Sequence, residues 1–76
     1  MSDQRPLPDA ELDAKRRSDA VAAQASRVLG DPMRARRWLR RENRILGAPP
    51  IDLLGTRAGM QAVLDELGRI ESGDFV

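Results

Sequence analysis

The sequence predicts a small all-α domain, and three observations support this fold class. Alanine, leucine and arginine are plentiful, whereas valine, isoleucine and aromatic residues are scarce, and this composition favours helix over strand. Apolar residues recur at spacings of three and four, and no stretch alternates with a period of two. A chain of 76 residues allows one domain with a small core. We therefore expect three main helices plus a short one-turn helix.

The first helix is expected to begin near Asp9 and to end near Leu29. Pro6 and Pro8 prevent an earlier start, so residues 1–8 are expected to be a flexible lead and residues 9–76 a single helical domain. One narrow face of this helix carries small residues at helical spacing: Ala14, Ser18, Val21, Ala25 and Val28. The pattern also allows two shorter helices with a break near residues 17–19.

A second helix follows after a glycine. Gly30 suits the left-handed conformation that ends a helix, Asp31 is a good N-cap, and Pro32 suits the first helical position. One arc of about 100° then carries the apolar residues Ala35, Trp38 and Leu39, and arginines occupy the remainder. The tryptophan is therefore expected on the packed side of this helix.

The stretch LGAPPIDLLG separates the second helix from the last one. Gly47 and Pro49 stop any helix, Pro50 opens a single turn, and Thr56 is positioned to cap the final helix. That helix should end at residues 72–73. Its apolar face comprises Met60, Val63, Leu64, Leu67 and Ile70, with Gln61, Ala62, Asp65, Glu66 and Arg69 expected on the opposite, solvated side.

The apolar positions of these elements define an expected core. Its members lie at the end of the first helix, on the inner face of the second, in the one-turn helix and on the inner face of the last: Val28, Leu29, Trp38, Leu39, Leu53, Leu54, Val63, Leu64 and Leu67.

The composition argues against catalysis. Histidine and cysteine are absent, which removes imidazole bases, thiolate nucleophiles, disulfides and the common zinc sites, and no glycine-rich phosphate loop is present. We expect no catalytic residues, no metal and no cofactor, and thus not an enzyme. No segment has the roughly 18 apolar residues of a membrane span or the pattern of a signal peptide, so we expect a cytoplasmic protein without a membrane partner.

Charge is distributed unevenly along the chain. Residues 27–57 carry eight arginines against three acidic residues, whereas residues 58–76 carry one arginine against four acidic residues. The candidate contacts for nucleic acid or a protein partner are Arg34, Arg37, Arg40, Arg41 and Arg44. The competing interpretation is a solvated helix face, which the near-zero net charge and the expected burial of Trp38 favour. A DNA-binding accessory protein is the alternative function.

The stretch from ASRVLGDP to GRIESGDF resembles the toxin-binding domain of the Xre/MbcA/ParS antitoxin family. The resemblance begins with Gly-Asp after an apolar pair, continues with Trp-Leu in a helix, and then has Leu-Gly and Pro before a DLL turn. It ends with a helix that finishes in GRIESG. The matching positions are Ala25, Val28, Leu29, Gly30, Asp31, Ala35, Trp38, Leu39, Leu46, Gly47, Pro50, Asp52, Leu53, Leu54, Gly59, Val63, Leu64, Leu67, Arg69, Ile70, Glu71 and Gly73.

The resemblance implies a protein partner and not a reaction. Members of this family pair with RES-domain toxins, enzymes that degrade NAD⁺, and their last helix and tail close the toxin pocket. Carried over by position, the toxin-binding residues would be Leu67, Ile70, Glu71, Ser72, Gly73, Asp74, Phe75 and Val76. Ser72 and Asp74 depart from the family pattern, and the residues ahead of the domain are too few for the helix-turn-helix of longer members. The small core also suggests a homo-oligomer.

Overall fold

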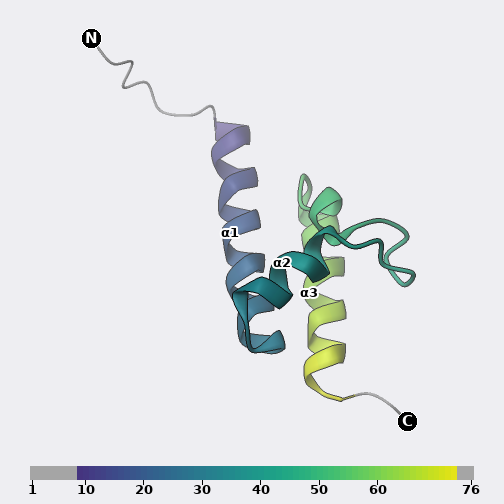
Figure 1. The fold of residues 1–76 in the computed structure, drawn as a ribbon. Coiled ribbons are helices and arrows are strands. Elements are labelled where there is room, and N and C mark those ends of the chain that lie inside the picture. Colours follow the sequence, from purple (N-terminus) through teal and green to yellow (C-terminus); the bar gives the residue numbers. More distant parts are fainter. Residues whose placement is uncertain (1–8, 74–76) are drawn as a thin grey trace.

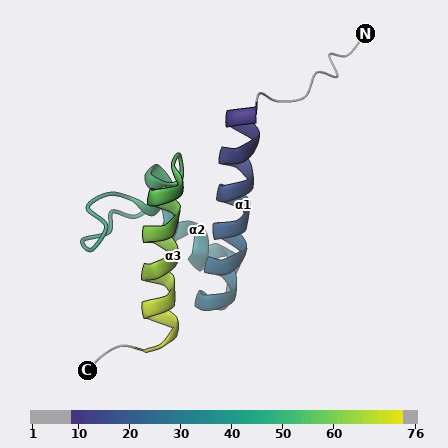
Figure 2. The same cartoon turned by 180° about the vertical axis from the view of Figure 1, so that it is seen from behind.

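The computed structural model describes residues 9–73, which form three α-helices and one turn of 3₁₀ helix. These are α1 (Asp9–Leu29), α2 (Pro32–Arg40), η1 (Pro50–Leu53) and α3 (Arg57–Glu71). Helices α1 and α3 lie side by side and run in the same direction, and α2 crosses one face of the pair (Figure 1). Figure 2 shows α1 and α3 from the face that α2 leaves uncovered. The predicted all-α class, with three main helices and a one-turn helix, is confirmed.

Helix α1 is continuous through residues 17–19, so the two-helix alternative is wrong. Its small-residue face packs inward, with Val21 and Ala25 completely buried. No residue of helix-breaking type lies between Asp9 and Leu29, so the helix continues without a break until Gly30. The predicted lead, residues 1–8, lies outside the described residues.

The end of α1 and the starts of α2 and α3 are where the local sequence signals placed them, whereas α2 ends at Arg40, ahead of Gly47. Gly30 has a φ of 82°, and the Asp31 side chain accepts a hydrogen bond from the Met33 amide at 3.0 Å, with Pro32 at the first position of α2. At the start of α3, Thr56 Oγ1 accepts from the Gly59 amide at 3.0 Å. Each cap satisfies an amide that has no partner within the helix.

The core is small and built largely from short side chains. Its buried residues are Val21, Ala25, Ala35, Leu39, Leu54, Val63 and Leu67. The other positions expected in the core pack against this cluster while keeping some exposed surface: Val28, Leu29, Trp38, Leu53 and Leu64. Trp38 therefore lies at the rim of the core.

The turn η1 packs directly on the first turn of α3. A β-carbon added at Gly59 would collide with the Leu53 carbonyl oxygen, lie 2.8 Å from the Leu53 carbonyl carbon and approach Thr56 Oγ1 to 3.1 Å. Only glycine permits the two backbones to approach this closely. Gly59 thereby fixes where η1 lies on α3.

A second contact joins the same region to α1. Arg17 Nε donates to the Leu54 carbonyl at 2.9 Å, and one terminal guanidinium nitrogen donates to the Gly55 carbonyl at 3.0 Å. These two carbonyls lie between η1 and α3, so one side chain of α1 holds the connection that precedes α3. A charged donor makes each of these hydrogen bonds stronger than a neutral pair.

We predict that Gly59→Ala destabilises the fold, with about 1–3 kcal/mol of overpacking exceeding the ~1 kcal/mol gain in helix propensity. The matched control is Gly68→Ala in the same helix, where an added β-carbon meets nothing within 4 Å. The control should be neutral or stabilising by up to ~1 kcal/mol. Thermal unfolding followed by circular dichroism measures both. Equal melting temperatures for the two variants would contradict the close approach at Gly59.

We predict that Arg17→Ala lowers the free energy of unfolding by about 1–2 kcal/mol, because two carbonyls lose a charged donor. Arg17→Lys should recover about half of this loss, since an ammonium group cannot reproduce the two-pronged geometry. The neighbouring Arg16→Ala, at an exposed position, serves as the control and should change stability by less than about 0.5 kcal/mol. Urea unfolding of the three variants provides the comparison, and a loss in Arg16→Ala equal to that in Arg17→Ala would refute the assignment.

Candidate functional site

The end of α3 is a firmly capped helix terminus. The Ser72 amide donates to the Gly68 carbonyl at 2.9 Å, the Ser72 hydroxyl donates to the Arg69 carbonyl at 3.1 Å, and the Gly73 amide donates to the Ile70 carbonyl at 3.1 Å. Gly73 has a φ of 65°, which turns the backbone out of the helix. The structure therefore defines the chain as far as Gly73.

The residues proposed from the resemblance fall into four groups. Glu71 and Ser72 are exposed, whereas Ile70 and Gly73 are partly buried. Leu67 has no exposed surface and belongs to the core, so a partner cannot contact it unless the core opens. The remaining three, Asp74, Phe75 and Val76, lie outside the described residues.

Glu66 corrects one expectation about this helix. The sequence pattern placed it on the solvated side, but its side chain is 7% exposed. Arg69 donates from Nε to Glu66 Oε1 at 2.9 Å and from a terminal nitrogen to Glu66 Oε2 at 2.8 Å. On a helix, Glu66 lies only about 60° from Val63, at the border of the apolar face. The arginine fork satisfies both carboxylate oxygens, which makes this burial tolerable.

The arginines of α2 and the following residues form a second charged region. Arg34, Arg37, Arg40, Arg41 and Arg44 are all exposed. No ion pair joins any of them to another residue in the described part of the chain. Their charge is thus available to solvent or to a partner.

Trp38 lies between two hollows in this region. One hollow, of about 270 Å³, is lined by Leu29, Arg34, Arg37, Trp38 and Arg41. The other, of about 240 Å³, is lined by Trp38, Arg41, Glu42, Asn43 and Arg44. The structure therefore brings four of the five candidate arginines to the border of the indole, whereas Arg40 borders neither hollow.

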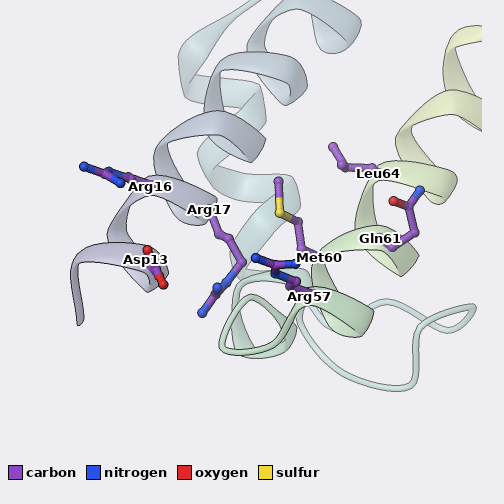
Figure 3. A pocket seen from close by; sticks show the side chains of 7 residues that line it. All are labelled: Asp13, Arg16, Arg17, Arg57, Met60, Gln61 and Leu64. Atoms are coloured by element: carbon purple, nitrogen blue, oxygen red, sulfur yellow. The ribbon is translucent and has the colours of Figure 1, made fainter. Parts of the chain in front are cut away.

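A third hollow, of about 350 Å³, lies between α1 and α3 (Figure 3). Its lining consists of Asp13, Arg16, Arg17, Arg57, Met60, Gln61 and Leu64. In Figure 3, Arg17 reaches toward α3 while Arg16 points away from it. Arg17 already donates to the Leu54 and Gly55 carbonyls, so it joins α1 to the connection that precedes α3 beside this groove.

The described surfaces have several features that suit binding. Between residues 9 and 73, no three His, Cys, Asp or Glu side chains are grouped closely enough to hold a metal ion. None of the helices in this segment combines the length and apolar character needed to cross a bilayer. The exposed features are charged side chains, a partly exposed indole and a capped helix end, all of which suit contact with another macromolecule.

Comparison with known proteins agrees with the resemblance in the sequence. Residues 24–73, which are 50 of the 76, match the family described as the antitoxin Xre/MbcA/ParS C-terminal toxin-binding domain. No curated protein and no solved structure matched the chain. The matched segment begins in the second half of α1 and ends at Gly73, so it contains all of α2, η1 and α3. The chain therefore belongs to the Xre/MbcA/ParS antitoxin family and carries its toxin-binding domain.

Proposed function

We propose that this protein is an antitoxin that binds and neutralises a RES-type, NAD⁺-degrading toxin. The end of α3 and the residues after it, Ile70–Val76, close the toxin's active site. The observation that supports the proposal most is the family match. It covers residues 24–73 and so includes the end of α3 and its cap. On this proposal the chain regulates an enzyme in the cytoplasm and needs no cofactor of its own.

The charge at the end of α3 supports the proposed contact. Glu71 is exposed, whereas the charge of Arg69 is balanced by the buried Glu66 carboxylate. The C-terminal end of a helix also carries a partial negative charge. An acidic helix end suits a pocket that holds the phosphates of a dinucleotide with cationic groups.

The cap at Ser72 and Gly73 supports the same role energetically. A segment that enters a partner's pocket loses conformational freedom, and this loss reduces the affinity. Because hydrogen bonds already fix the backbone as far as Gly73, this part of the segment loses little further conformational freedom on binding. A pre-organised helix end can therefore position the following residues at lower entropic cost.

Self-association is part of the proposal. Among residues 9–73 the core cluster has seven buried members, and four of these are alanine or valine. So small a core gains stability from further burial in an oligomer. Light scattering coupled to size exclusion, with and without the toxin, would give the stoichiometry.

We predict that a variant ending at Gly73 loses inhibition while keeping its fold. It retains every helix cap that the structure describes, so its melting temperature should stay within a few degrees of the full chain. The measurement is NAD⁺ consumption by the co-purified toxin, with circular dichroism as the folding control. Full inhibition by the folded, shortened chain would exclude a part for residues 74–76.

We predict that Glu71→Arg weakens toxin binding by about tenfold or more, because a like charge would face the cationic pocket. Asp65→Arg is the matched control, since it makes the same change in net charge at an exposed position of the same helix. It should change the affinity by less than about threefold. Calorimetry with a catalytically inactive toxin gives both constants, and equal losses would show that net charge matters and the helix end does not.

A further inference from the structure

We propose that the surface around Trp38 binds single-stranded nucleic acid. This Trp38 surface comprises Leu29, Arg34, Arg37, Trp38, Arg41 and Arg44, the residues that border the two hollows beside the indole apart from Glu42 and Asn43. Phosphates would contact the arginines, and a base would stack against the exposed part of the indole. The surface lies on α2, the residues after it and Leu29 at the end of α1, and it shares no residue with the helix end that the proposed antitoxin function uses.

The arrangement of charge around Trp38 favours contact with phosphates. Arg34 and Arg37 lie about 60° apart around the axis of α2, next to the direction of Trp38, and Arg41 is the C-cap of the same helix. They are exposed and have no acidic partner in the described segment. A row of unpaired guanidinium groups is a suitable set of contacts for successive phosphates.

The partial exposure of Trp38 favours stacking with a base. A solvated helix face requires the arginines to point outward but does not require an aromatic ring among them. Trp38 nevertheless borders both hollows, and only part of it packs against the core. An indole beside arginines is the combination with which proteins stack unpaired bases and hold the flanking backbone.

The size of the two hollows beside Trp38 favours a small part of a longer ligand. Volumes of about 270 and 240 Å³ fall below the 300–1,000 Å³ of pockets that enclose drug-sized ligands. They suit a base or a phosphate of a longer strand better than a complete cofactor. Glu42 borders the smaller hollow and opposes a phosphate there. The backbone of the strand is therefore expected at Arg34, Arg37 and Arg41.

The chain offers a direct probe, because Trp38 is its only tryptophan. Titration of the full chain with an oligothymidylate of about 12 nucleotides should quench the intrinsic fluorescence at low salt. The logarithm of the binding constant should fall linearly with the logarithm of the salt concentration, with a slope of about −2 for three phosphate contacts to a single strand. An unchanged fluorescence at low salt, with no retention of labelled oligonucleotide, would overturn the proposal.

Two double variants separate a defined site from general positive charge. Arg37→Ala with Arg41→Ala removes two arginines from the Trp38 surface and should lower the affinity about tenfold or more. Arg36→Ala with Arg40→Ala removes the same charge from positions of α2 that border neither hollow, and should lower it less than about threefold. Fluorescence anisotropy of a labelled strand measures both variants. Equal losses would overturn the proposal in favour of diffuse electrostatic attraction.

Further comparisons test the stacking and the ligand class. Trp38→Phe should retain binding in the anisotropy assay, whereas Trp38→Leu, checked for an intact melting transition, should lose about tenfold. A hairpin duplex and polyglutamate serve as competitors, and both should compete weakly. Effective competition by either would overturn the proposal and assign the surface to duplex DNA or to an acidic protein.

Discussion

The crossing of α2 over α1 is the contact on which the rest of the structure depends. Ala25 and Ala35 are both in the buried cluster, and alanine at such positions lets two helices pack closely. That packing makes the core thin and leaves Trp38 at its rim. It also fixes the rotation of α2, because Ala35 and Leu39 must face inward. The outward direction of the arginines then follows from the burial of Ala35 and Leu39.

Helix caps and turns, which depend on a few neighbouring residues, are predictable from the sequence. Contacts between residues far apart in the sequence are not. The Asp31 and Thr56 caps, the left-handed Gly30 and the Pro50 turn each depend on neighbours within one helical turn. Arg17, in contrast, donates to carbonyls 37 and 38 positions away, and no pattern in one sequence pairs them. The partial exposure of Trp38 is not predictable from the sequence either. A periodic pattern shows which side of the helix a residue faces, but the degree of burial depends on contacts with the other helices. The burial of Glu66 had a local signal, its i, i+3 spacing from Arg69, but the helix pattern alone assigns both residues to solvent.

The ion pair between Glu66 and Arg69 affects the proposed site as well as the fold. Arg69 is the one cation in the last turn of α3, and it would otherwise oppose Glu71 at the helix end. Arg69 donates two hydrogen bonds to the nearly buried Glu66 carboxylate, and this ion pair within α3 balances its positive charge. The helix end thus keeps an acidic character even though an arginine lies within it. Local pairing, and not composition alone, decides the charge that a partner meets at this end of the chain.

On the proposed function, stability and binding are coupled, because α3 contributes to both. Val63 and Leu67 bury their side chains in the core, and the proposed toxin-facing residues begin within one turn of Leu67. A partner that holds the end of α3 therefore also restrains a helix that the core requires. Ligand binding stabilises a folded chain by about 2.7 kcal/mol when the free ligand is at a hundred times its dissociation constant. For a domain with so small a core this is a large fraction of the total, since small domains have only a few kcal/mol of stability. A chain that loses its partner would consequently unfold more often. Through α3, dissociation of the complex would then shorten the lifetime of the protein.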